Sequence, residues 1–123
     1  MAANILVVED DSSHRNLICK VLRQEGYDVV EASDGTQALK LFYAGRFDLV
    51  ITDFSMPKLN GLKVVEQLHR LRPKLPIIFI TGYRSIPSGK KILENATEIL
   101  TKPFELDVLR STVRRLLINS ALS

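Results

Sequence analysis

A chain of 123 residues, 46% hydrophobic and 25% charged, has the length and composition of one globular domain. The formal net charge is only +3, and the one local group of basic residues is Arg110, Arg114 and Arg115, so we do not expect this domain to bind nucleic acid directly. No apolar run approaches the roughly 20 residues that span a bilayer, and no signal segment opens the chain. We therefore expect a cytoplasmic protein without a membrane segment. The single cysteine, Cys19, excludes an internal disulfide.

Five short apolar runs alternate with helical patterns along the chain. We expect strands over 5–8, 27–31, 48–52, 76–80 and 98–101, the second nearer a sheet edge because it carries charges. The first helix is expected over 12–25, and the second from a cap at Ser33 or Asp34 to Gly45. A third helix is expected to end at Leu71, a short fourth one to lie within 85–95, and a fifth one to follow Phe104. The predicted inward stripes are Leu17, Ile18, Val21 and Leu22; Ala38, Leu39, Leu41 and Phe42; Leu62, Val64, Val65, Leu68 and Leu71; and Leu106, Leu109, Val113, Leu116 and Leu117.

This alternation predicts an α/β fold with a parallel sheet and helices on both faces, because crossovers between parallel strands are almost always right-handed. Ligands of such sheets bind outside the carboxyl ends of the strands. Glu9 and Asp10 follow the first strand, Asp53 the third, Thr81 the fourth and Lys102 the fifth. Each feature alone would be a turn residue or a helix cap, but together they predict one site.

Three carboxylates in one pocket repel each other, and a hard divalent cation offsets that repulsion. Mg²⁺ prefers oxygen ligands in octahedral geometry and retains several waters. A carboxylate in such a field can attack phosphorus as a nucleophile, with an ammonium and a hydroxyl stabilising the transferred group. The sequence thus predicts an Mg²⁺-dependent phosphoryl acceptor, with Lys102 and Thr81 supplying the last two groups.

The segments that carry this chemistry resemble the receiver domain of bacterial response regulators over essentially the whole chain. They are Ile5-Leu6-Val7-Val8-Glu9-Asp10-Asp11, Asp53-Phe54-Ser55-Met56-Pro57 with Gly61, Thr81-Gly82, and Lys102-Pro103-Phe104. The resemblance implies a flavodoxin-like (βα)₅ fold with a doubly wound sheet of order 2-1-3-4-5, and a single receiver domain over 1–123.

The resemblance also implies the roles of individual residues. Asp53 matches the phospho-acceptor, which takes its phosphoryl group from the phosphohistidine of a sensor histidine kinase or a phosphotransfer protein. Glu9, Asp10, Asp53 and the backbone carbonyl of Ser55 match the Mg²⁺ ligands, and Thr81 and Lys102 match the groups that contact the phosphoryl. The implied protein is a signalling switch acting on an output domain or downstream protein, not a turnover enzyme, with a possible homodimer through the face of the last helix.

Some residues have structural interpretations or depart from the family pattern. We expect Asp11, in competition with Ser12, to cap the first helix, and His14 and His69 to be surface residues. The position three before Lys102, usually aromatic in the family, is Ile99, which we expect to remain buried and passive. The conformational change would then fall on residues 82–95, which have few apolar anchors.

Three other functions compete with this interpretation. A phosphatase of the haloacid-dehalogenase type needs a second Asp two positions after the nucleophile, where this chain has Ser55. Flavin mononucleotide binding needs a phosphate loop after the first strand, where Glu9, Asp10 and Asp11 would repel the phosphate. A phosphorylation-independent pseudo-receiver that acts only as an interaction domain remains the alternative.

Overall fold

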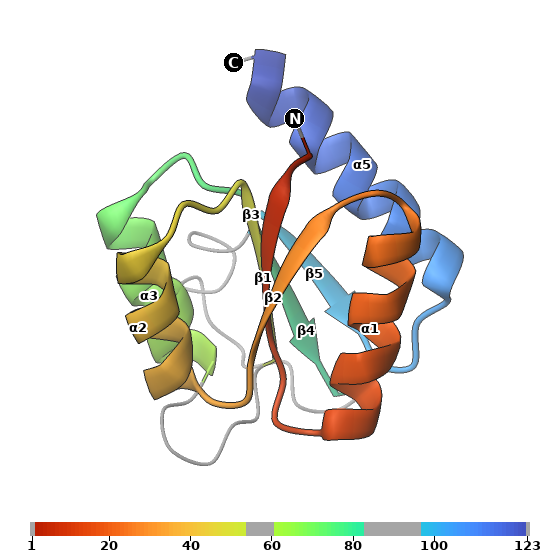
Figure 1. Ribbon diagram of the computed structural model, residues 1–123, viewed down its shortest axis with the longest axis horizontal. Coiled ribbons are helices and arrows are strands. Elements are labelled where there is room, and N and C mark those ends of the chain that lie inside the picture. The colour runs from red at the N-terminus through yellow and green to blue at the C-terminus, as the bar shows by residue number, and fades with distance from the viewer. Residues whose placement is uncertain (1, 54–60, 83–96, 123) are drawn as a thin grey trace.

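The computed structural model describes residues 2–53, 61–82 and 97–122. Ser55, the short helix expected within 85–95 and the side chain of Leu62 lie outside the described residues, as does most of the segment expected to move. The helix labels therefore pass from α3 to α5 (Figure 1).

Five parallel strands form one sheet in the order β2-β1-β3-β4-β5. The strands are β1 Asn4–Val8, β2 Asp28–Ala32, β3 Leu49–Asp53, β4 Ile77–Thr81 and β5 Glu98–Thr101. Every residue of β3 and β4 is buried, as expected for central strands covered on both faces, whereas the charged strand β2 lies at an edge. The predicted order and parallel arrangement are confirmed.

Four helices cover the sheet in the described part of the chain: α1 Ser12–Gln24, α2 Gly35–Ala44, α3 Gly61–Leu71 and α5 Leu106–Leu122. Asp11 caps α1 by accepting hydrogen bonds from the backbone N–H groups of Ser13 and His14, and Asp34 caps α2. Gly26 follows α1 with a φ of 91°, a left-handed conformation that glycine adopts without a Cβ clash. The predicted caps are thus confirmed.

Alternate residues of each strand belong to two separate cores. The helices α2 and α3 cover one face of the sheet, and α1 and α5 cover the other (Figure 1). Leu6 and Val8 pack in the core on the side of α2 and α3, whereas Ile5 and Val7 pack in the core on the side of α1 and α5. Among the residues that the structure describes, no helix is both long and apolar enough to cross a membrane.

Two residues predicted to face inward are exposed. Leu17 is 44% exposed and Leu71 is 42% exposed. Both lie beside the contact stripe of their helix, and the small side chain of Cys19 fills the buried position on α1. Leu109, Val113 and Leu116 of α5 are buried as predicted, while Leu106 and Leu117 are partly buried.

Candidate functional site

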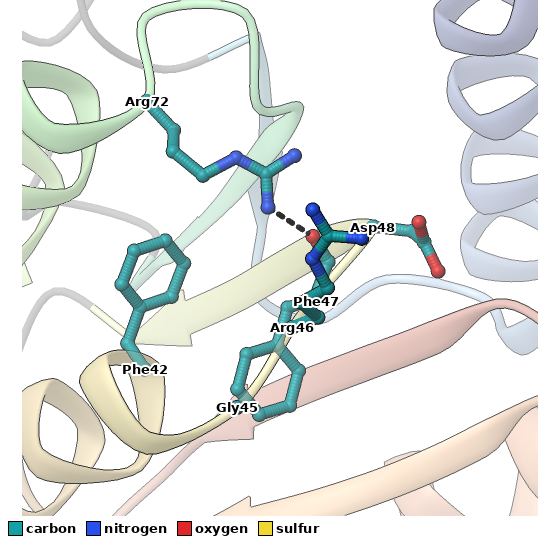
Figure 2. Close-up of a pocket in the computed structure, with 6 residues that line it drawn as sticks. All are labelled: Phe42, Gly45, Arg46, Phe47, Asp48 and Arg72. Carbon is teal, nitrogen blue, oxygen red and sulfur yellow. Dashed lines mark hydrogen bonds between the residues drawn. The ribbon is translucent and has the colours of Figure 1, made fainter.

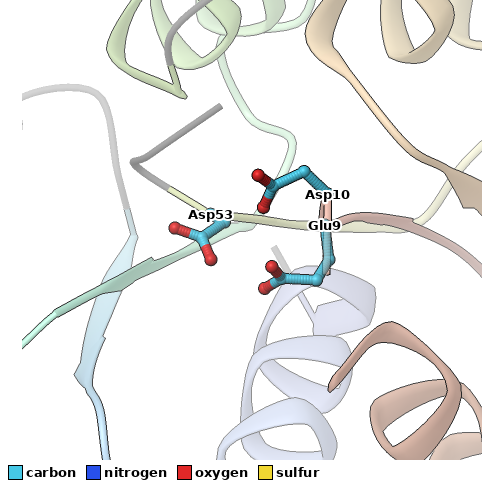
Figure 3. Close-up of side chains that lie close together, drawn as sticks. All are labelled: Glu9, Asp10 and Asp53. Atoms are coloured by element: carbon cyan, nitrogen blue, oxygen red, sulfur yellow. The ribbon is translucent and has the colours of Figure 1, made fainter. Parts of the chain in front are cut away.

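Three carboxylates meet where β1 and β3 end. One carboxylate oxygen from each of Glu9, Asp10 and Asp53 lies within 4.8 Å of the others (Figure 3). Glu9 and Asp53 are 1% and 3% exposed, whereas Asp10 is open to solvent. Parallel pairing of Val8 with Thr52 places the two strand ends side by side, so residues far apart in sequence share one pocket. The predicted acidic cluster is therefore present, with one solvent-facing and two buried members.

Lys102 reaches this cluster from the end of β5. Its Nζ lies 2.5 Å from Asp53 Oδ2 and 3.5 Å from Glu9 Oε2. The Lys102 backbone N–H donates to the Thr81 carbonyl at 2.8 Å, and the Lys102–Pro103 peptide bond is cis. Burial opposes the charge of the ammonium, but the hydrogen bond to Asp53 and the negative charges of Asp53 and Glu9 raise the pKa of Lys102 above its ordinary value. The ammonium therefore remains charged beside both carboxylates.

The acidity of Glu9 is strongly perturbed. Burial is the largest cause, followed by the hydrogen bond to Asp53 and its charge, and together they raise the pKa of Glu9 from 4.5 to about 8. The Asp11 backbone N–H, which donates to Glu9 Oε1 at 3.2 Å, and the Lys102 charge act in the opposite direction. A cation placed beside Glu9 and Asp53 would offset the repulsion between the two carboxylates and so favour the ionised form of Glu9.

Thr81 is the last residue of β4 and is 2% exposed. The register pairs Asp53 with Ile80, so Thr81 lies one residue beyond Asp53 along the neighbouring strand. Its hydroxyl lies 3.4 Å from the Gly82 carbonyl. All predicted site residues within the described part of the chain thus gather at the carboxyl edge of the sheet.

His14 was expected to be a surface residue, and that expectation is wrong. Its Nδ1 lies 3.1 Å from Glu9 Oε2, and its side chain is 25% exposed. The ring packs against Phe104, with centroids 5.8 Å apart and planes at 59°. Burial, and then the charge of Lys102, lowers the pKa of His14 below 6.5. One signal was present in the sequence: His14 follows the cap Asp11 by three residues and so belongs to the helical turn beside the acidic pair.

Arg15 is a second residue that the sequence patterns did not single out. Its Nη1 donates to the Glu9 backbone carbonyl at 2.8 Å, and its Nε donates to Glu31 Oε1 at 3.2 Å. Arg23 donates to the other Glu31 oxygen at 3.3 Å. These contacts tie the backbone of the acidic pair to α1 and to the edge strand β2.

A polar crevice also lies at the opposite edge of the sheet. Arg72 Nη1 donates to the Phe47 carbonyl at 2.7 Å, which ties the end of α3 to the start of β3 (Figure 2). The rings of Phe42 and Phe47 stack with centroids 6.1 Å apart, and Asp48 Oδ2 accepts from the Asn4 backbone N–H at 2.8 Å. These contacts join loops at the amino ends of the strands, far from the three carboxylates.

The donor chemistry of the carboxylate cluster fits Mg²⁺. It offers only hard oxygen ligands, and Asp10 is open to solvent, which suits a cation that retains water. The backbone carbonyl of Ser55, the remaining expected ligand, lies outside the described residues.

Bacterial regulatory proteins are similar in sequence to this chain. Transcriptional regulatory protein ZraR of Escherichia coli strain K12 is 34% identical over 118 residues, which are 95% of this chain and 27% of that protein. Response regulator MprA of Mycolicibacterium vanbaalenii is 39% identical over 118 residues, 95% of this chain and 51% of that protein. The chain therefore spans between about a quarter and a half of these curated relatives.

Solved structures and the family comparison agree with the sheet order. The response regulator protein TrrA of Thermotoga maritima, crystallised in complex with Mg²⁺ and BeF, matches with a TM-score of 0.87 and 36% identity over 94% of this chain and 99% of that one. A receiver domain protein from Clostridium thermocellum matches with a TM-score of 0.90 and 30% identity over 98% of both chains. The family described as response regulator receiver domain matches residues 5–114. With its parallel 2-1-3-4-5 sheet and its acidic pocket, this chain belongs to the response regulator receiver domain family.

Proposed function

We propose that the domain is a phosphorylation switch in which Asp53 accepts a phosphoryl group from a phosphohistidine. The observation that carries this proposal is the pairing of buried Asp53 with Lys102 at 2.5 Å, beside Glu9 and Asp10. Burying an isolated carboxylate costs folding free energy. A carboxylate that is buried beside an ammonium group and two further carboxylates is typical of a site that binds a cation and a phosphoryl group. The family consists of signalling modules, and we assign this chain to two-component signalling.

The transfer is a single displacement at phosphorus. A carboxylate oxygen of Asp53 forms the new P–O bond while the P–N bond to the donor imidazole breaks, and that imidazole leaves with the bonding electron pair and takes a proton. The transition state spreads negative charge over the equatorial oxygens, so positioned positive charge matters more than acid or base catalysis. Lys102 then exchanges part of its contact with Asp53 for a phosphoryl oxygen.

Thr81 and Lys102 would hold the product. Thr81 ends the strand next to Asp53, and its backbone carbonyl accepts a hydrogen bond from the Lys102 N–H, so the positions of the two donors are linked through the backbone. We assign the Thr81 hydroxyl and the Lys102 ammonium to separate phosphoryl oxygens. This arrangement links the modified residue to two neighbouring strands.

Glu9, Asp10 and Asp53 would hold Mg²⁺ together with the Ser55 carbonyl. When bound, the ion supplies positive charge against the three carboxylates and a phosphoryl oxygen. Glu9 and Asp10 follow β1, and Asp53 ends the adjacent buried strand β3, so neighbouring strand ends would offer the three carboxylates to the ion, and the exposure of Asp10 would admit water. TrrA of Thermotoga maritima, a relative by fold and sequence, was crystallised with Mg²⁺ and BeF.

The partners follow from the same proposal. A sensor histidine kinase or phosphotransfer protein would supply the phosphoryl group, and an output domain or downstream protein would read the change. Two relatives named above are longer regulators, and the present chain covers 27% and 51% of them. The proposal also includes a homodimer through the face of α5.

The test is to incubate the protein with acetyl phosphate and Mg²⁺ and to map the acid-labile adduct by mass spectrometry. We expect one phosphoryl group, on Asp53, that disappears with EDTA and in Asp53→Asn. The matched control is Asp28→Asn, which removes an exposed carboxylate from the edge strand. Full labelling of Asp53→Asn, or an adduct on Asp10 or Asp11, would refute the assignment. A parent protein that binds neither Mg²⁺ nor the phosphoryl group would instead favour the pseudo-receiver.

A further inference from the structure

We propose that His14 is a positioning residue that holds the Glu9 carboxylate in the orientation needed at the metal site. The inference rests on the proposed Mg²⁺-dependent phosphorylation and goes beyond it, because it assigns a function to a residue outside the expected site. His14 would act through Glu9 and would contact neither the metal nor the phosphoryl group.

The contacts of Glu9 show why a tether is needed. Its Oε1 accepts from the Asp11 backbone N–H at 3.2 Å, and its Oε2 lies 3.1 Å from His14 Nδ1 and 3.5 Å from Lys102 Nζ. Lys102 has its shorter contact with Asp53. The imidazole is therefore closer to Oε2 than the ammonium is, and its contact does not involve the side chain that we assign to the phosphoryl group.

The imidazole is itself held in position on two sides. The His14 backbone N–H donates to the Asp11 cap at 3.2 Å, which fixes the first turn of α1. The ring packs on Phe104, from the segment that follows Lys102. His14 thus connects the acidic pair after β1 with the loop that presents Lys102, and a side chain so restrained loses little entropy when it bonds Glu9.

The two oxygens of Glu9 are restrained from two directions. The Asp11 backbone N–H contacts Oε1 at 3.2 Å, and His14 Nδ1 lies 3.1 Å from Oε2, so loss of the imidazole would leave one side of the carboxylate without this restraint. Removal of a side chain that hydrogen-bonds to a metal ligand typically lowers the metal affinity 10- to 100-fold.

The experiment compares four intact chains: the parent, His14→Leu, His14→Asn and Leu17→Ala. Leucine retains apolar volume but has no hydrogen-bonding atom, whereas the Asn amide nitrogen is attached to Cγ, as Nδ1 is in histidine. Leu17 is exposed on the same helix and serves as the control. Mg²⁺ affinity is measured by amide chemical-shift titration, and labelling by acetyl phosphate is measured in parallel. Thermal melts in EDTA verify that each variant is folded.

We expect Mg²⁺ to bind His14→Leu about tenfold more weakly than the parent, with His14→Asn and Leu17→Ala close to the parent value. Ring ¹⁵N signals of His14 should shift when Mg²⁺ is added, while those of His69 on α3 stay constant. A parent-like affinity of His14→Leu would overturn the inference. So would a folded His14→Asn that binds as weakly as His14→Leu, or an unchanged His14 ring signal. If Mg²⁺ binding depends on His14 while Asp53 takes no phosphoryl group, the proposed function alone fails.

Discussion

Replacing Glu9 by Gln should stabilise the metal-free protein at high pH and have little effect at low pH. Burial, then the hydrogen bond and charge of Asp53, raise the pKa of Glu9 from 4.5 to about 8. For a carboxyl group whose pKa is raised in the folded state, the stabilisation is complete below about pH 4.5 and disappears as the pH rises through about 8. The parent should therefore lose stability across this window, and Glu9→Gln should lack that loss.

The size of the effect follows from the same two pKa values. The difference between 4.5 and about 8 corresponds to at most about 5 kcal/mol at 1.36 kcal/mol per pKa unit. The 33% exposed side chain of Lys102 admits water beside Glu9, so we expect about 2 kcal/mol, within the range for buried polar groups in proteins. The substituted amide would retain the shape of the side chain and the acceptor for the Asp11 N–H.

The assay is urea unfolding followed by circular dichroism in EDTA at about pH 5, 7 and 9. Asp28→Asn, which removes an exposed carboxylate, controls for the change in net charge. The reasoning is refuted if Glu9→Gln is no more stable than the parent at about pH 9, or if its advantage is the same at about pH 5.

Three further predictions concern the metal, a helix cap and the switch. Asp10→Ala should abolish stabilisation by Mg²⁺, which in the parent amounts to about 2.7 kcal/mol at 100 times Kd, as thermal melts would show; a retained Mg²⁺ effect contradicts the ligand assignment. Asp11→Ala should lose about 1 kcal/mol of unfolding free energy in urea, because α1 loses its cap, and an unchanged midpoint would dispute that contribution. Ile99→Val should preserve the amide chemical-shift response to Mg²⁺ and beryllofluoride, because Ile99 packs half-buried against the core and has no ring to reorient; loss of the response would make Ile99 part of the switch.

Local chemistry explains which features were predictable from the sequence. Runs such as Ile5 to Val8 are apolar on both faces, and this pattern is typical of central strands, as the buried β1 confirms. Asp11 and Asp34 precede helical patterns and cap them, because capping depends only on neighbouring backbone groups. Glu9 and Asp53 each stand at the end of an apolar run, and parallel strands end at the same edge of a sheet, so the sequence predicted that these two carboxylates lie at one edge.

Two of the errors concern side chains at the margin of a helical stripe. Leu17 and Leu71 fit the apolar spacing but are exposed, because the width of the buried stripe depends on how closely the neighbouring element packs. The apolar periodicity indicates which face of a helix is directed inward, but it does not show which side chains at the margin of that face are covered. Cys19, the small side chain two positions after Leu17, is completely buried.

The sequence by itself determined the succession of apolar runs, the caps and the identity of the acidic residues, because these depend on neighbours along the chain. Only the tertiary structure decided the contact of Lys102 with Asp53 at 2.5 Å and the contact of His14 with Glu9 at 3.1 Å. Lys102 and Asp53 are 49 positions apart, and His14 reaches Glu9 across a turn into a new helix. The residue pattern indicates which side chains come near one another, but the packing of strands and helices decides which atoms touch.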